Sequence, residues 1–135
     1  MLRCILSIVF IVFILSGVRS QTGGETKGRS LAKLLNEIST VKWRQDSMGT
    51  QGYREKWFGE LENAIPDNTT EGQLLAVLGR PSVQRIFQLT TEYQYYLMDF
   101  KHYQEHPLFD HPYLVFTVDS VTKRITSVRK DFLCF

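Results

Sequence analysis

The stretch that decides the fold is Thr70-Glu71-Gly72-Gln73-Leu74-Leu75-Ala76-Val77-Leu78-Gly79-Arg80-Pro81. The side chain of Thr70 can accept the backbone N–H of Gln73 while the Gln73 side chain returns to the Thr70 N–H, which is a capping box. Leucine and valine then recur three and four residues apart and form one apolar stripe. Gly79 allows a left-handed end, and Pro81 cannot continue the helix. The stretch therefore predicts a helix of about two turns that must pack on another element.

Two more amphipathic helices are predicted before this stretch. Ser30 is suited to cap the first one, whose apolar face repeats at helical spacing through Leu31, Leu34, Leu35 and Ile38. Residues 39–41 contain β-branched side chains, which weaken a helix and predict its end. The second helix is expected at 55–65, where an apolar face recurs at the same spacing: Trp57, Phe58, Leu61, Ala64 and Ile65.

The segment between these two helices, residues 43–54, contains two glycines and has an aromatic residue near each end, Trp43 and Tyr53. This composition predicts an ordered loop that the two rings hold in place. Asp46 and Arg54 are suited to an ion pair that bridges the loop. We expect this acid and base to be structural, and the alternative is that they form a polar recognition site.

After residue 81 the apolar pattern changes to a period of two, which predicts strands at 86–89, 91–100, 113–119 and 124–132. Residues 120–123 predict a tight antiparallel connection. In the strand at 91–100 neither face is polar, because one carries Tyr93, Tyr95 and Leu97 and the other Tyr96, Met98 and Phe100. We expect this strand to be central in a sheet covered on both sides, and the alternative is that it displays tyrosines for contact.

These elements predict the α+β class, with two to three N-terminal helices packed on a three- to four-stranded antiparallel sheet. Residues 30–135 are expected to form a single domain with one core. Residues 21–29 are polar and contain glycine, so they predict a flexible lead.

Residues 1–20 have the pattern of a secretory signal peptide. Arg3 precedes an apolar run over residues 4–18, which is shorter than the about 20 residues of a transmembrane helix. The residues at 18–20 suit cleavage after Ser20. The alternative is that residues 4–18 are retained as an N-terminal membrane anchor. We therefore expect an exported protein of the periplasm or cell envelope that contacts a membrane only if the leader is retained.

Charge and cysteine content narrow the classes of partner. The whole chain has 16 basic and 14 acidic residues, and loss of residues 1–20 removes Arg3 and Arg19 and no acid. The remaining 14 basic and 14 acidic residues balance, so no nucleic-acid partner is expected. Cys134 would be the single cysteine left, which predicts no internal disulfide. An intermolecular disulfide is the alternative to an idle thiol.

Residues that could carry chemistry are few. The three histidines lie between two predicted strands at His102, His106 and His111. Pro107 and Pro112 favour an extended loop there, and metal binding by the imidazoles is the alternative. The sequence has no phosphate-binding glycine loop, no G-x-S-x-G elbow and no Cys–His pair with an orienting residue. We therefore expect no enzyme activity, no cofactor and no metal.

Four segments follow one another in an order that resembles a known family: the helix at 70–81, Tyr95-Tyr96-Leu97, residues 114–119 and residues 123–128. The order is similar to that of the SmpA/OmlA (BamE-like) envelope proteins, in which a helix ending in L-G-x-P precedes a sheet. The resemblance covers residues 68–128, and the chain has no lipobox cysteine. It implies a small α+β domain with a non-enzymatic role, typically binding other envelope proteins.

The function expected from the sequence is that of a non-enzymatic exported binding or scaffold protein of the bacterial cell envelope, whose partner is an envelope or secreted protein. The alternative is an inhibitor or immunity protein against a secreted enzyme. The expected contact residues are aromatic, because aromatic side chains dominate interface energetics: Trp43, Tyr53, Tyr95, Tyr103 and Tyr113. The alternative for these residues is that several of them fill the core.

Overall fold

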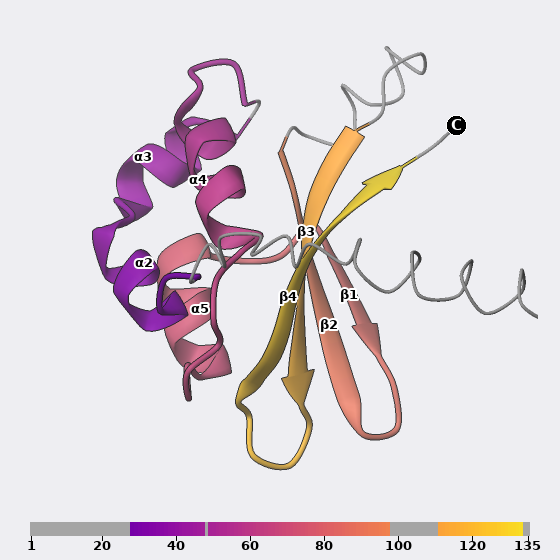
Figure 1. Ribbon diagram of the computed structural model, residues 1–135. Coiled ribbons are helices and arrows are strands. Elements are labelled where there is room, and N and C mark those ends of the chain that lie inside the picture. The colour runs from indigo at the N-terminus through magenta and orange to yellow at the C-terminus, as the bar shows by residue number, and fades with distance from the viewer. Residues whose placement is uncertain (1–27, 48, 98–110, 134–135) are drawn as a thin grey trace, which may run out of the picture.

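The computed structural model describes residues 28–47, 49–97 and 111–133. Within these residues four helices come first: α2 (Leu31–Glu37), α3 (Thr40–Gln45), α4 (Tyr53–Leu61) and α5 (Glu71–Leu78). Four strands follow: β1 (Val83–Ile86), β2 (Thr90–Tyr96), β3 (His111–Asp119) and β4 (Ile125–Leu133). The strands form one antiparallel sheet in chain order, and the helices cover one of its faces (Figure 1). The predicted α+β architecture is therefore confirmed.

The helix predicted at 70–81 is α5. The Gln73 N–H donates to Thr70 Oγ1 at 3.3 Å and the Thr70 N–H donates to Gln73 Oε1 at 2.8 Å, so the capping box is complete. Gly79 has a φ of 74° and closes the helix. The Glu71 N–H also donates to the Lys123 carbonyl at 2.9 Å, which attaches the start of α5 to the connection between β3 and β4.

Two tyrosines of β2 hold α5 onto the sheet. The Tyr93 hydroxyl donates to the Glu71 carboxylate at the start of α5, and the Tyr95 hydroxyl donates to the Gly79 carbonyl at its end at 2.8 Å. Burial and the hydrogen bond to Glu71 raise the pKa of Tyr93 to about 12, and burial raises the pKa of Tyr95 as well. Both phenols are therefore neutral near pH 7 and act as hydrogen-bond donors.

The central position expected for β2 is confirmed, but the described helices cover one face of the sheet rather than both (Figure 1). The strand lies between β1 and β3, and its tyrosines are buried on both faces of the sheet. Tyr93 and Tyr95 belong to the main core under the helices, whereas Tyr96 packs edge-on against Tyr113 of β3 on the opposite face, with 5.4 Å between ring centroids. Met98 and Phe100, expected on the same face as Tyr96, lie outside the described residues.

The structure corrects the expected boundaries around β1. The strand covers residues 83–86 rather than 86–89, and residues 87–89 form the turn to β2. The Phe87 N–H donates to the Thr90 carbonyl at 2.8 Å and closes this turn. An apolar composition predicted a strand at these positions, but the reversal of the chain falls within the apolar run.

The loop expected at 43–54 also differs in the structure, because residues 40–45 form the short helix α3 and α4 already begins at Tyr53. The Ser39 side chain accepts the Lys42 N–H at 3.4 Å and caps this helix. Trp43 of α3 is completely buried and stacks on Phe58 of α4, with 6.2 Å between ring centroids. Tertiary packing of one large aromatic residue here outweighs the weak helix propensity of β-branched residues.

The helix expected at 55–65 is α4, but it begins at Tyr53 and ends at Leu61. Ile65 is extended and exposed: its N–H donates to the Arg29 carbonyl at 2.9 Å, and its own carbonyl accepts the Leu31 N–H at 2.8 Å. These bonds form an isolated parallel bridge between Ser30 and Ile65. The bridge joins the start of the described chain to the segment that follows α4.

Candidate functional site

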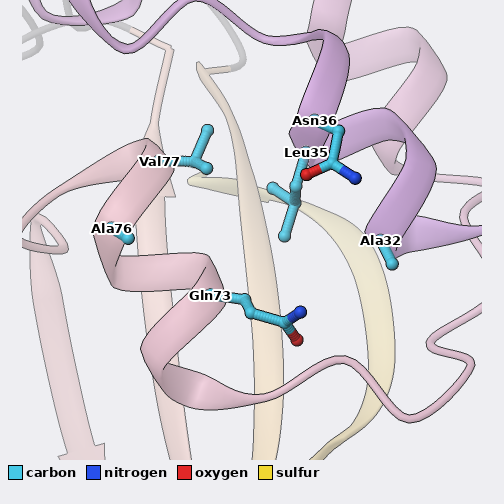
Figure 2. Close-up of a pocket in the computed structure, with 6 residues that line it drawn as sticks. All are labelled: Ala32, Leu35, Asn36, Gln73, Ala76 and Val77. Atoms are coloured by element: carbon cyan, nitrogen blue, oxygen red, sulfur yellow. The ribbon is translucent and has the colours of Figure 1, made fainter.

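A small groove opens between α2 and α5, with a volume of about 190 Å³. Each helix contributes three residues to its lining: Ala32, Leu35 and Asn36 from α2, and Gln73, Ala76 and Val77 from α5. Figure 2 shows these side chains projecting from the two helices into the space between them. The groove is smaller than the about 300–1,000 Å³ of most small-molecule sites, and its size suits one apolar side chain.

The groove follows from the spacing of residues on both helices. In each helix the three lining residues occupy positions i, i+3 and i+4, which lie next to one another on a helical surface. Leu35 is 2% exposed and forms the apolar floor. Ala32 and Ala76 have side chains too short to fill the space between the helices. Two alanines at one helix contact therefore leave the groove open.

Two carboxamides lie at the rim of the groove, on Asn36 and Gln73. The Gln73 oxygen accepts the Thr70 N–H at 2.8 Å and the Thr70 hydroxyl at 3.2 Å. Within the part of the chain that the structure describes, the Gln73 amide nitrogen and the Asn36 carboxamide have no hydrogen-bond partner. A carboxamide carries both donors and an acceptor, the same groups as a peptide unit. The rim can therefore bind the backbone of a segment whose apolar side chain enters the groove.

The structure places three of the aromatic residues expected at a contact surface in the core, which was the alternative for these residues. Trp43 is 0% exposed and Tyr95 is 2% exposed, both in the core beneath the helices. Tyr113 is 9% exposed and packs on Tyr96. These three rings cannot be exposed anchors for a partner, because folding already buries them. Tyr103 lies outside the described residues.

Tyr53 is half-buried at the start of α4 and also has a structural role. Its hydroxyl accepts the Ser39 N–H at 2.8 Å, and its ring packs edge-on against Trp57 with 6.3 Å between centroids. Of the predicted contacts that the structure describes, none lines the groove between α2 and α5. The groove was not predicted from the sequence, because aromatic residues were expected at the contact surface. The groove is lined instead by alanines, carboxamides and two aliphatic side chains.

Asp46 and Arg54 hold the loop between α3 and α4. Asp46 is 1% exposed, and its carboxylate accepts the N–H groups of Gln51 and Arg54, both at 2.9 Å. The Arg54 guanidinium lies 4.9 Å from the Trp43 ring and donates to the carbonyls of Trp43 at 2.9 Å and Tyr96 at 3.3 Å. The contact of Asp46 with Arg54 is made by the Arg54 backbone N–H, and the salt bridges of the described residues do not include the expected ion pair with the guanidinium. The structural role expected for both residues is supported, since their side chains connect the loop to α3, α4 and β2.

Within residues 28–47, 49–97 and 111–133, no group of three or more His, Cys, Asp and Glu side chains is placed to hold a metal ion. His102, His106 and the His111 side chain lie outside what the structure describes, as does Cys134. Among the described residues, no helix has the length and hydropathy to cross a bilayer. The leader at residues 1–20 and the lead at 21–27 are outside these residues too.

Comparison of the chain with protein-family models, with curated proteins and with solved structures gives no significant match. The resemblance to the SmpA/OmlA (BamE-like) proteins therefore stays a prediction from the sequence.

Proposed function

We propose that this chain is a non-enzymatic exported binding protein of the bacterial cell envelope, which binds a protein partner at the groove between α2 and α5. The observation that carries the proposal is an apolar groove with two carboxamides at its rim that have free hydrogen-bonding groups. Export is supported by the signal-peptide pattern of residues 1–20.

The groove suits a peptide segment better than a free small molecule. One leucine- or methionine-sized side chain of the partner would contact Leu35 and Val77, while Asn36 and Gln73 would pair with the peptide groups on either side. An interface with one anchor is weak, so we expect a Kd of about 1 μM to 1 mM for an isolated peptide. Tighter binding would need contacts outside the groove.

The test compares a variant with a filled groove with a matched surface variant. In Ala76→Leu the longer side chain occupies the groove at an exposed helical position, and in Gln45→Leu the same residue is introduced at an exposed position of α3. Each chain is used as bait in an extract of the cell envelope, with capture quantified by mass spectrometry. We expect Ala76→Leu to reduce recovery of the partner at least tenfold and Gln45→Leu to leave it unchanged.

Two results would contradict the proposal in different ways. Equal recovery by both variants would exclude the groove as the binding site. Repeated captures at native abundance that retrieve no partner with the unaltered chain would contradict the binding function itself. Should the captured partner be a secreted enzyme whose activity falls when the chain is added, the inhibitor or immunity alternative would replace the scaffold role.

A further inference from the structure

Two turns of the sheet lie side by side, one between β1 and β2 and the other between β3 and β4. The Ser120 N–H in the second turn donates to the Leu89 carbonyl in the first at 3.0 Å, and the pairing of β2 with β3 continues down to Thr90 and Asp119. Figure 1 shows both turns projecting at the lower end of the sheet. We call residues 86–89 and 120–124 the hairpin tip.

The hairpin tip exposes large apolar side chains. Ile86 is 76% exposed, Phe87 51%, Leu89 69% and Val121 83%. Tight turns are normally rich in glycine, proline, asparagine, aspartate and serine, because those residues suit the backbone geometry. Single exposed apolar residues are ordinary, but a cluster of them marks a surface for interaction. These four side chains are exposed in the structure of the described residues.

Basic side chains surround the apolar cluster. Arg85, Lys123 and Arg124 are all exposed beside the two turns, and Arg124 donates to the neutral Asn68 side chain at 2.7 Å. The tip therefore presents an apolar centre with cations at its border.

Three acidic side chains near the tip already have partners. The Asp119 carboxylate accepts the N–H groups of Val121 at 3.1 Å and Thr122 at 2.6 Å. Glu92 pairs with Arg129 of β4 at 2.9 Å, and Glu71 accepts the Tyr93 hydroxyl. Lys123 lies close enough to the Asp119 carboxylate to help lower its pKa, and Arg85 stands opposite Glu92 in the pairing of β1 with β2. In the part of the chain that the structure describes, no ion pair joins Arg85, Lys123 or Arg124 to these three carboxylates.

We propose that the hairpin tip is a membrane-contact site, which inserts Phe87 and Leu89 into the interface of an anionic bilayer while Arg85 and Lys123 bind lipid phosphates. A protruding apolar tip with a basic border is complementary to a flat, deformable and negatively charged surface. This contact is separate from the leader, through which alone a membrane contact was expected, and from the groove between α2 and α5. A few apolar side chains give only weak, reversible binding, so the tip orients a protein that a second contact holds at the membrane.

The proposal is tested by measuring how deeply the hairpin tip enters a bilayer. Phe87→Trp and Leu89→Trp each place an indole in the tip of the full-length chain, and Val41→Trp places one on α3, where Val41 is 64% exposed. The native Trp43 and Trp57 are buried and common to all three variants. Vesicles of phosphatidylserine and phosphatidylcholine carry bromine on the acyl chains, which quenches only indoles at that depth.

We expect bromine to quench the added indole of Phe87→Trp and Leu89→Trp and to leave that of Val41→Trp unchanged in the full-length chain. Adding Arg85→Gln and Lys123→Gln should reduce the quenched fraction on anionic vesicles, because each cation contributes about a fivefold preference for such a surface. On pure phosphatidylcholine the charge substitutions should have no effect.

Three outcomes would overturn the proposal. No quenching at residues 87 and 89, or equal quenching at residue 41, would mean that the tip does not enter the bilayer. A blue shift of the Phe87→Trp signal with protein concentration and no vesicles would assign the tip to contact between two copies of the chain. A shift produced only by a purified protein partner would make the tip part of a protein interface instead. None of these results depends on whether the groove binds a peptide.

Discussion

Where β2 ends, next to the loop between α3 and α4, polar side chains are buried, whereas at the hairpin tip, where β2 begins, apolar side chains are exposed. Asp46 is 1% exposed and Phe87 is 51% exposed, the reverse of what polarity alone would give. The buried carboxylate is explained by the backbone groups that it satisfies. The exposed apolar residues contribute backbone hydrogen bonds to the turns, but their side chains remain exposed and available for another surface.

The comparison predicts the largest loss of stability for Trp43→Ala at the loop end. Removal of a completely buried indole that stacks on Phe58 should lower the free energy of unfolding by about 3–5 kcal/mol, measured by urea denaturation. Phe87→Ala at the tip is the matched control and should change it by less than about 0.5 kcal/mol. Similar losses at both positions would remove the distinction between the two ends.

A second prediction concerns the buried carboxylate. Asp46→Ala leaves the N–H groups of Gln51 and Arg54 without their acceptor, and should lower the free energy of unfolding by about 2–3 kcal/mol. Asp46→Asn keeps one acceptor and should lose less. Glu55→Ala changes an exposed carboxylate in the first turn of α4 and should cost under about 1 kcal/mol. A cost for Asp46→Ala no greater than for Glu55→Ala would show that the loop does not depend on this side chain.

A third prediction separates the cap of α5 from the neighbouring hairpin tip. Thr70→Ala removes the acceptor of the Gln73 N–H and should cost about 1 kcal/mol. Amide hydrogen exchange should become faster in α5 and remain unchanged in β1. Thr50→Ala, at an exposed loop position, is the control. Unchanged exchange in α5 would argue that packing alone fixes the start of the helix.

The smallest effect on stability is predicted for the tip itself. The double substitution Phe87→Ser and Leu89→Ser should leave the free energy of unfolding within about 0.5 kcal/mol of the original, because both side chains are already in water in the isolated chain. Thermal unfolding followed by circular dichroism would test this expectation. A drop of several degrees in Tm would place these residues among those that hold the fold.

The parts of the fold that could be predicted are those whose sequence signals come from neighbouring residues in the chain. The two ends of α5 can be predicted from the capping residues Thr70 and Gln73 and from Gly79. The period-two pattern of apolar residues predicts the strands. The signal at Trp43 was misleading, because its helix is stabilised by a ring on α4 that a local pattern cannot reveal. The predicted boundaries of β1 were three residues too late in the chain, because the apolar residues at 86–89 were expected to be buried in a strand.

The candidate sites were harder to predict than the fold. The spacing 32, 35 and 36 recurs as 73, 76 and 77, but only the tertiary structure brings the two sets of residues together. Tyr95 and Tyr113 were expected at a surface because aromatic residues dominate interfaces, yet the same property makes them good core residues. The apolar tip was visible in the sequence at 86–89, where it was assigned to a strand.

The parallel bridge between Ser30 and Ile65 limits how many residues can be removed from the amino end without loss of a backbone hydrogen bond. Arg29 must be kept because its carbonyl accepts the Ile65 N–H, and Gly28 packs so closely on the Asn63 carbonyl that a Cβ there would clash with it. A peptidase that cuts after Ser20 would leave Gly28, Arg29 and the bridge between Ser30 and Ile65 intact. Cleavage at the site predicted from the sequence is therefore compatible with the fold of the described residues.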